Sequence, residues 1–353
     1  MNPFSLIQPE NQPDEVLPLT AAEFSRLPVM REMESAVKEG AAIAVALSGG
    51  ADSLALCVLL HEWVLARHLT LHALTVDHSL RPESAEEARR VGALATAHCP
   101  GLRHVVLRRD PEKIAPTRLQ EEARRDRYRL MRGYCVSHGI RYLCLAHHQD
   151  DQVETFLFRL AKGSGIDGLA GMRAVVPAGD ADLDYVRPLL DIPKGRLVAA
   201  CRARGLDFIN DPSNSDERFA RARMRAWLQG LSSEGFSIKR LTQTAQRMER
   251  AARALEDIAA QVWKKALLTQ SPAELVLSLG EVALQPEDIR VRILMRALER
   301  VGGGAGYGPR LEQVEDLQRH IFDKTGFTRT TLHHCLIEKS GARQTLRFVR
   351  ENA

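Results

Sequence analysis

The sequence lacks any apolar run that approaches the ~20 residues a membrane-spanning helix needs. Its N-terminal stretch also lacks a basic leader followed by a continuous apolar core. The first absence excludes a membrane-spanning helix, and the second gives no sign of export. We therefore expect a cytoplasmic protein that has no membrane partner.

Cysteine is scarce and unpaired. The 6 cysteines are scattered without a C-x-x-C pair, which excludes a disulfide framework and a zinc ribbon and predicts reduced, mostly buried thiols. Internal repeats and low-complexity tracts are absent too. What remains is ordinary globular composition: 353 residues with 44% hydrophobic side chains, which is enough for about two or three domains with sizeable cores.

Positive charge is concentrated locally, although the net charge of +4 is mild. The segment "RFARARMR" contains Arg218, Arg221, Arg223 and Arg225. Such a cluster indicates a polyanionic partner. Other basic and polar residues precede it, namely Arg187, Lys194, Asp211 and Asn214. Basic residues in several segments can position an RNA backbone.

Apolar runs alternate with helical patterns in the N-terminal part of the chain. The runs that we predict as strands span 42–47, 70–76, 104–107 and 141–146. Before them, a capping box of Thr20 and Glu23 predicts a lead-in helix that stops at Gly40. The alternation predicts an α/β fold, with a Rossmann-like parallel sheet covered by helices on both faces.

The C-terminal part follows another pattern. Beyond about residue 225, a long amphipathic helix precedes further helical segments, and the strand-like runs "TRTTLHHCLIEKS" and "QTLRFVRE" come last. We predict an N-terminal extension over 1–40, an α/β domain over 41–225, and a mainly helical region over 226–353 that ends in a hairpin.

Polar segments follow the predicted strands. In open parallel sheets, ligands bind beyond the carboxyl ends of the strands, so the segments "SGGADS", "DHSLRP" and "HHQDD" become the candidate site. Asp77 and His78 open the second segment, and we include them among the nucleotide-binding candidates. A sheet that only had to fold would not require this concentration of histidine and aspartate.

The segment "SGGADS" comprises Ser48, Gly49, Gly50, Ala51, Asp52 and Ser53. Its glycines allow a tight turn with inward N–H groups, and the next helix adds its positive end, so the segment predicts an anion cradle. It lacks the lysine of a nucleoside-triphosphate loop, which suits a pyrophosphate complexed with Mg²⁺, and Asp52 is a candidate metal ligand. The alternative is a plain capped turn in which Asp52 serves the helix dipole.

The segment "HHQDDQVET" combines two histidines with three carboxylates. On helical spacing, His147, Asp151 and Glu154 fall on one face, where they can hold a hard cation or steer a proton. Two alternatives are simple N-capping by Asp150 and Asp151 and a zinc site, although carboxylates beside a phosphate loop favour magnesium.

The arginine-rich segment "EEARRDRYR" places Arg124 and Arg127 at a spacing of three. Their apolar neighbours Ala123 and Tyr128 suggest that these two arginines face the interior or a substrate, whereas Arg125 does not. The alternative is a solvated helix face. The glycine-rich "GSGIDGLAGM" at 163–172 is either a loop that closes over a ligand or a simple connection.

Together these motifs resemble a known enzyme family. "SGGADS", "VDHSLR", "EEARRDRY", "LAHHQDDQVETFLFRLAKGSGIDGLAGM", "RPLL" and "DPSN" occur in the order typical of tRNA(Ile)-lysidine synthetases, within the PP-loop superfamily of N-type ATP pyrophosphatases. The resemblance covers roughly residues 41–225. It implies a PP-loop catalytic domain there and a tRNA-binding region over 226–353.

The resemblance also implies a reaction and its participants. ATP activates the wobble cytidine of the CAU anticodon of tRNA(Ile), and L-lysine then displaces AMP to give lysidine. Residues 48–53 would bind ATP, while Asp52 and Asp151 would hold Mg²⁺ or orient the attacking amine. Arg124 and Arg127 would contact the phosphates or the base, with His147 and Glu154 nearby. The oligomeric state is left open, with a homodimer as one candidate.

Two other functions use similar sequence features. A tRNA-thiolating enzyme of the same superfamily needs a persulfide-carrying or cluster-binding cysteine near the site, and no cysteine here directly follows a motif strand. A non-catalytic nucleotide- or RNA-binding regulator would not need carboxylates opposite the phosphate loop. Asp151 and Glu154 argue against that reading.

Overall fold

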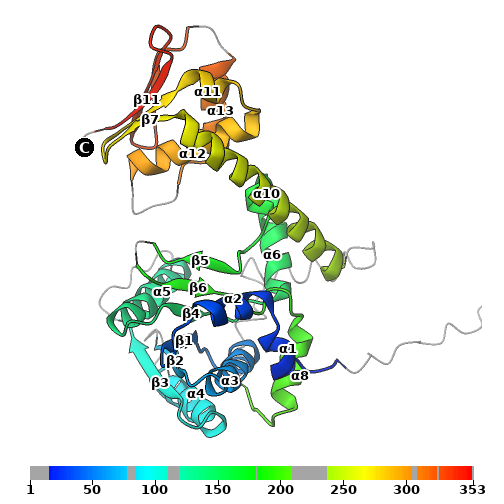
Figure 1. The fold of residues 1–353 in the computed structure, drawn as a ribbon. Coiled ribbons are helices and arrows are strands. Elements are labelled where there is room, and N and C mark those ends of the chain that lie inside the picture. Colours follow the sequence, from blue (N-terminus) through cyan, green and yellow to red (C-terminus); the bar gives the residue numbers. More distant parts are fainter. Residues whose placement is uncertain are drawn as a thin grey trace, which may run out of the picture. The chain divides into compact units, whose positions relative to one another are not determined.

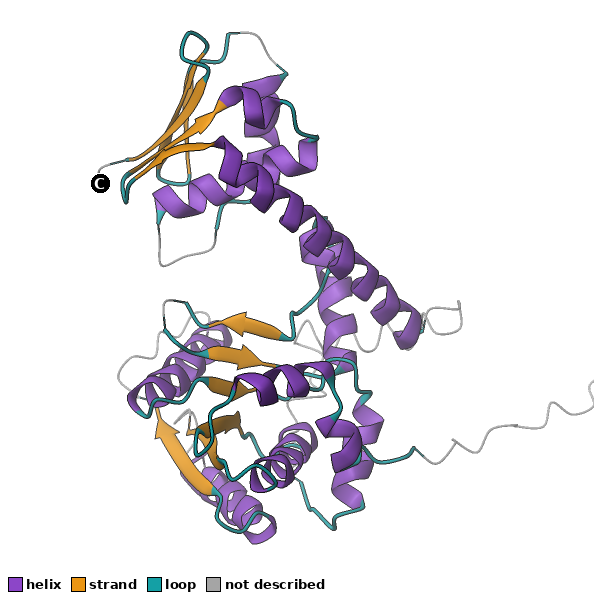
Figure 2. Cartoon of the chain, viewed as in Figure 1, coloured by secondary structure: helices purple, strands orange, loops and turns teal. Residues whose placement is uncertain are grey.

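The chain forms two compact units in the computed structural model, which is drawn in Figures 1 and 2. The structure describes residues 16–77, 84–109, 119–179, 181–208, 237–303, 308–323 and 326–351. Unit 1 comprises Met1–Leu157 with Met172–Thr242, and unit 2 comprises Phe158–Gly171 with Gln243–Ala353. The predicted domain boundary at 225 lies outside the described residues, and the three-segment division stays a prediction.

Unit 1 is built on a six-stranded sheet in the order β3-β2-β1-β4-β6-β5. The strands are β1 (Ala42–Ala46), β2 (Thr70–Asp77), β3 (Arg103–Arg108), β4 (Tyr142–Cys144), β5 (Val175–Pro177) and β6 (Asp184–Val186). All neighbours pair in parallel except β5 and β6. The predicted strands and their parallel pairing are confirmed. The last two strands were missed because runs of three residues give no periodic signal.

Helices cover both faces of this sheet, as predicted (Figure 1). The helices that pack on it are α3 (Ala51–Leu65), α4 (Ser84–His98), α5 (Leu119–Ser137) and α8 (Lys194–Arg202). Two further helices follow β4 along the chain: α6 (Gln149–Leu160), and α7 (Ile166–Leu169), which belongs to unit 2. Side chains of a strand alternate between faces. Ile43 and Val45 therefore join the core with α3, α4 and α8, whereas Ala44 packs with Met131 and Cys135 of α5.

The N-terminal segment forms two short helices where one was predicted: α1 (Ala21–Ser25) and α2 (Pro28–Ala36). Pro28 has no N–H to donate and its ring clashes with the preceding turn, so a helix cannot continue through it, whereas it fits the first position of a new helix. The predicted capping box is confirmed, because the Thr20 hydroxyl accepts from Glu23 N–H and the Glu23 carboxylate accepts from Thr20 N–H.

Unit 2 combines helices with a second sheet. After α10 (Ile238–Ala266), a five-stranded antiparallel sheet has the order β7-β8-β11-β10-β9. Its other elements are β7 (Leu267–Gln270), β8 (Glu274–Ser278), α11 (Leu279–Ala283), α12 (Glu287–Gly302), α13 (Leu311–Phe322), β9 (Arg329–Leu332), β10 (Cys335–Ser340) and β11 (Thr345–Arg350). The helical content and the β10–β11 hairpin are confirmed.

The extent of that sheet differs from the prediction. The run "TRTTLHHCLIEKS" forms two strands, because His333 and His334 adopt φ of 49° and 58° and turn the chain between β9 and β10. Two histidines in the left-handed backbone conformation give no turn signal in a sequence, because glycine and asparagine are the usual residues in such turns. Across the described helices of both units, none is long and apolar enough to span a membrane.

The N-terminal helices are tied to α8 by charge. Arg196 of α8 donates from Nη2 to both carboxylate oxygens of Glu23 at 2.8 Å. The N–H of Thr20 and then the guanidinium of Arg196 lower the pKa of Glu23 from 4.5 to about 2. A depressed carboxyl pKa stabilises the fold above its unfolded value, and this stabilisation is lost as the pH falls through the folded value.

We expect Glu23→Gln to lower the free energy of unfolding by about 0.5 kcal/mol above pH 5, the size typical of exposed ion pairs. Glutamine keeps the capping box, so only the charge is removed. The difference from wild type should shrink as the pH falls from about 4.5 towards 2, which thermal unfolding at several pH values measures. Glu32→Gln on the exposed face of α2 is the control, and a pH-independent difference for Glu23→Gln would contradict the assignment.

Candidate functional site

The segment Ser48 to Ser53 connects β1 to α3 at the carboxyl end of the sheet. Ser53 Oγ accepts from Ser48 N–H at 3.2 Å and donates to the Gly50 carbonyl at 3.0 Å, which closes the turn. Gly49 has φ of 86°, a conformation that side chains disfavour. Gly50 is the N-cap of α3 and supplies no side-chain cap, so the first N–H groups of the helix are left for an anion.

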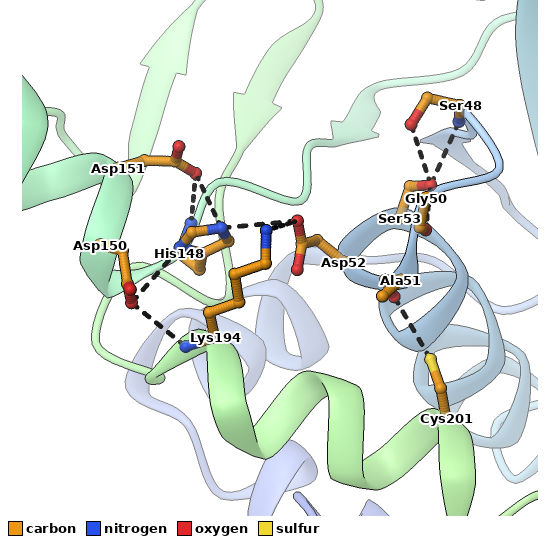
Figure 3. A network of polar contacts seen from close by, with 10 residues as sticks. All are labelled: Ser48, Gly50, Ala51, Asp52, Ser53, His148, Asp150, Asp151, Lys194 and Cys201. Atoms are coloured by element: carbon orange, nitrogen blue, oxygen red, sulfur yellow. Dashed lines mark hydrogen bonds and ion pairs between the residues drawn. The ribbon is translucent and has the colours of Figure 1, made fainter. Parts of the chain in front are cut away.

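Asp52 and Asp151 meet at one imidazole (Figure 3). His148 Nε2 lies 3.5 Å from Asp52 Oδ2 and 3.5 Å from Asp151 Oδ2. The His148 side chain is only 3% exposed, so these interactions occur in a poorly hydrated environment. The carboxylate at the start of α3 and the one in the first turn of α6 thus belong to a single polar cluster.

Asp151 also caps its own helix. Its Oδ2 accepts from the backbone N–H of His148 at 3.0 Å, which is how a carboxylate in the first helical turn reaches back to the cap. Asp151 therefore does cap the start of α6, as the capping alternative states. It does not exclude a chemical role, because the same carboxylate oxygen faces the imidazole that contacts Asp52.

Charge around His148 changes the pKa of the groups that it contacts. Burial would lower the pKa of His148, but the hydrogen bond to Asp52 and the charges of Asp151, Asp52 and Asp150 outweigh burial and raise it. For Asp52, burial would raise the pKa, but the hydrogen bond and charge of His148, together with Lys194, lower it. The cluster therefore favours an ionised Asp52 beside a protonated imidazole.

Lys194 supplies the cation that the loop itself lacks. It opens α8, its Nζ lies 3.5 Å from Asp52 Oδ2, and its backbone N–H donates to Asp150 Oδ1 at 3.2 Å (Figure 3). The sequence placed Lys194 only among basic residues for an RNA backbone. The signal that could have located it is a proline followed by lysine at a helix start, in a segment next to the sheet edge.

The structure corrects one geometric assumption. His147 lies in the segment before α6, which begins at Gln149, so helical spacing does not relate His147 to Asp151 and Glu154. The imidazole that contacts both aspartates is His148, which the sequence analysis did not select. Glu154 is buried on α6, one turn after Asp151.

The second polar segment is described only in part. Asp77 ends β2 and is buried, and its carbonyl accepts from Arg109 N–H at 2.9 Å. His78 lies outside the described residues, as do Asp211, Asn214 and the arginine cluster 218–225. The predicted roles of these residues stay predictions.

The predicted arginines lie on the exposed face of α5. Arg124, Arg125 and Arg127 are all exposed. Contrary to the expectation, burial therefore does not distinguish Arg124 and Arg127 from Arg125. Arg124 lies 5.3 Å from the centre of the Tyr128 ring. Arg109, whose Nε donates to Asp126 at 2.6 Å, fixes this part of α5 to the end of β3. The proposed contacts of Arg124 and Arg127 with substrate stay predictions.

The glycine-rich segment 163–172 contains helix α7 and is held by ion pairs and hydrogen bonds. Within unit 2, Arg292 of α12 contacts both carboxylate oxygens of Asp167, at 2.5 and 3.0 Å. Arg159 donates to the carbonyls of Gly168 and Gly171 at 2.8 Å. These contacts favour a fixed connection over a loop that closes on a ligand.

Two side chains hold the segment in which the chain returns to unit 1. Gln152 of α6 donates from Nε2 to the Met172 carbonyl at 2.8 Å, and the Met172 N–H donates to Gln152 Oε1 at 2.6 Å. Arg187, which follows β6, donates from Nη1 to the Arg173 carbonyl at 2.9 Å. These bonds fix the segment after the glycines beside the first turns of α6, where Asp151 lies.

Comparison with known proteins identifies relatives over most of the chain. Residues 25–230 match a family described as PP-loop domain. The tRNA(Ile)-lysidine synthase of Methylobacterium nodulans is 39% identical over 340 residues, which cover 93% of this chain and 96% of that protein. The corresponding synthase of Rhodopseudomonas palustris is 39% identical and covers 79% of this chain and 80% of its own length.

Among solved structures, the U34-tRNA thiolase NcsA of Methanococcus maripaludis has a similar fold. The TM-score is 0.50 with 14% sequence identity, and the match covers 67% of this chain and 77% of that one. An identity this low supports the likeness of the fold alone.

We expect Gln152→Met to lower the free energy of unfolding by about 2 kcal/mol, because it leaves the Met172 N–H and carbonyl without their side-chain partner. Methionine preserves the length and volume of the side chain. Urea denaturation measures the loss, with Gln149→Met on the same helix as the control, for which we expect less than about 0.5 kcal/mol. An equal loss in both variants would show that the two bonds are not what Gln152 contributes.

Proposed function

The chain belongs to the tRNA(Ile)-lysidine synthase family, and from this premise we propose that it ligates L-lysine to the wobble cytidine of the CAU anticodon of tRNA(Ile). The observation that carries the proposal is the meeting of Asp52 and Asp151 at His148, directly after a phosphate-type loop. The PP-loop domain supports ATP as the co-substrate.

The reaction proceeds in two steps. The carbonyl oxygen of the cytidine attacks the α-phosphorus of ATP, and the bond to pyrophosphate breaks. The amino group of lysine then attacks the adenylated ring carbon, loses a proton, and displaces AMP together with the original oxygen. Adenylation is needed because a carbonyl oxygen is a poor leaving group, whereas AMP is a good one.

The loop binds the phosphates of ATP in this proposal. The uncapped N–H groups at the start of α3 meet the negative charge, and the hydroxyls of Ser48 and Ser53 lie 3.1 Å apart beside them. Gly49 and Gly50 keep the backbone open to a close approach. The Nζ of Lys194 adds a positive charge next to Asp52, which stabilises pyrophosphate as it departs.

Asp52 and Asp151 fit a magnesium ion that accompanies the nucleotide. Mg²⁺ prefers oxygen ligands and in such sites uses one or two carboxylates together with substrate phosphates. Asp52 Oδ1 is buried without a hydrogen-bond partner among the described atoms, so an oxygen is left for the ion. The described residues hold no cluster of three or more protein ligands that could bind a metal by themselves, which is consistent with a shared ion. When bound, the magnesium ion would neutralise charge on pyrophosphate.

The remaining residues of the proposal act on lysine and the base. Asp151 orients the attacking amine, with His147 and Glu154 nearby. Arg124 and Arg127 contact the nucleotide phosphates or the cytidine. The anticodon base is already unpaired, so presenting it costs less than extracting a base from a duplex. The region 226–353 binds the rest of the tRNA.

A thiolation enzyme is less well supported. Cys201 lies near the loop, with its Sγ donating to the Ala51 carbonyl at 3.3 Å. Its side chain is fully buried, and burial raises the pKa of the thiol to about 11. A protonated, inaccessible thiol cannot carry a persulfide. A non-catalytic regulator would leave Asp52 and Asp151 without a purpose.

The proposal predicts that the purified chain transfers labelled lysine to tRNA(Ile) transcripts in the presence of ATP and Mg²⁺, with release of AMP and pyrophosphate. Label in the tRNA fraction is measured after acid precipitation. A transcript with uridine at the wobble position is the substrate control, because uridine lacks the amino-substituted ring of cytidine. Absence of label from the cytidine transcript would refute the function.

Matched variants test the carboxylate in the same assay. Asp151→Asn keeps the helix cap but removes the charge, and we expect it to reduce the transfer rate by about 100-fold, as for the loss of one electrostatic catalytic group. Asp182→Asn, with a side chain that is 88% exposed, should leave the rate unchanged. If both variants behave alike, Asp151 has no special role.

Lys194→Gln should raise the KM for ATP by roughly tenfold and change the KM for lysine little, because the ammonium is proposed to meet pyrophosphate. Initial rates at varied ATP and at varied lysine separate the two constants. Lys38→Gln, an exposed site beside α2, is the control. A rise confined to the KM for lysine would instead place Lys194 at the amino-acid site.

A further inference from the structure

The peptide group that enters the nucleotide loop is held from the side of β2. Pairing of β1 with β2 ends at Ala46 and Leu74, and the next residue, Leu47, donates its N–H to the Leu74 carbonyl at 2.9 Å. The Leu47 carbonyl then accepts from the Thr75 hydroxyl at 2.9 Å. A side chain of β2 thus continues the strand contacts for one more residue.

This carbonyl fixes the direction of a loop N–H. The carbonyl of Leu47 and the N–H of Ser48 belong to one planar trans peptide group, so they point in opposite directions and turn together. With the carbonyl bound to Thr75, the Ser48 N–H points into the loop, where Ser53 Oγ accepts it at 3.2 Å. Release of the Thr75 bond would free the whole peptide plane to rotate.

The Thr75 hydroxyl is itself held by a histidine. His104 of β3 lies with Nε2 2.9 Å from Thr75 Oγ1. A hydroxyl has one proton to donate, and here the Leu47 carbonyl receives it. His104 must therefore donate Nε2–H to Thr75, which defines its tautomer. Burial lowers the pKa of His104, which is consistent with a neutral ring that donates through this nitrogen.

A glycine in α4 makes room for that ring. A Cβ placed on Gly92 would lie 2.2 Å from His104 Nδ1 and 2.5 Å from Cε1, closer than real Cβ contacts occur. The imidazole occupies the space between α4 and the sheet that a side chain at 92 would fill. On β2, the small Ala73 pairs with His104, so the ring leans towards Thr75 two residues further along the same face.

We propose that His104 and Thr75 are positioning residues for the nucleotide loop. The imidazole orients the Thr75 hydroxyl, and the hydroxyl holds the Leu47 carbonyl. The same peptide group then donates the Ser48 N–H to Ser53 Oγ, the bond that closes the loop in which the anion binds. Neither side chain touches the nucleotide; both act through the backbone. The inference rests on the proposed binding of ATP phosphates by residues 48–53 and adds to it the groups that set the loop's geometry before ATP binds.

The test compares ATP affinities of the full-length chain and its variants by calorimetric titration with ATP and Mg²⁺. Thr75→Val removes the hydroxyl at nearly constant shape and should weaken ATP binding roughly tenfold, because the Leu47 carbonyl loses its partner. Thr75→Ser keeps the hydroxyl and should restore affinity to within about twofold. Thr96→Val, whose hydroxyl donates to backbone carbonyls within α4, is the matched control.

A second variant perturbs the relay, by which we mean the hydrogen bonds from His104 through Thr75 to the Leu47 carbonyl, without changing β2. Gly92→Ala displaces the His104 ring and should weaken ATP binding by about threefold, while the KM for lysine stays constant. Thermal unfolding of every variant defines a temperature at which all are folded, and affinities are compared there. Loss of affinity in Thr75→Val and Gly92→Ala, with rescue by Thr75→Ser, supports the relay.

Two results would overturn it. If Thr75→Val binds ATP as tightly as Thr96→Val, or if valine and serine at 75 weaken binding equally, the hydroxyl does not position the loop. The proposed function is judged separately by lysine transfer in the wild type. If the wild-type chain binds ATP without transferring lysine, the proposed function is refuted, and the ATP affinities of the variants still decide whether His104 and Thr75 position the loop. If the wild-type chain binds no ATP, both proposals are refuted.

Discussion

The parallel pairing of β1 with β4 is the constraint on which the candidate site depends. Val45 pairs with Cys144 in the same direction, so the loop after β1 and the segment after β4 leave the sheet at the same edge. That common edge is why the start of α3 and the start of α6 can share the imidazole of His148. Were the two strands antiparallel, Asp52 and Asp151 would lie at opposite ends of the sheet. The chemistry is thus set first by strand direction and only then by side-chain type.

Much of unit 1 could be predicted from the sequence, because its signals are local. The apolar runs of β1 and β2, the glycines before α3, and the carboxylates after β4 each report their own surroundings. His148 could not be selected in this way, since its importance comes from contacts across the fold. For Lys194 the local signal marks only a helix start, and the contact with Asp52 again comes from the fold. Adjacent histidines at 147 and 148 look alike in a sequence, and the direction of each ring is decided only when α6 begins at Gln149.

Unit 2 illustrates a different limit. Its strands are four to six residues long and carry alternating polar side chains, so each is weak evidence when taken alone. Its sheet is specified by pairing of β8 with β11 across a long stretch of chain, and the apolar positions Leu275, Leu277 and Phe348 gain their meaning only when α12 packs on them. A hairpin was visible because its two strands are neighbours in sequence, whereas β7 and β8 join it from a distance.

The buried cysteines have a practical consequence. All six are free and buried, and burial raises the pKa of Cys135 to about 12 and that of Cys335 to about 11. A hydrogen bond with Cys57 lowers the pKa of Cys99, but that thiol is fully buried. Thiol reagents attack the accessible thiolate, so we expect the folded chain to react slowly with them. A cysteine introduced at an exposed position in either unit would react selectively with a dye or spin label. Labelled pairs would then measure the distance between the two units with and without substrates, with every native thiol left in place.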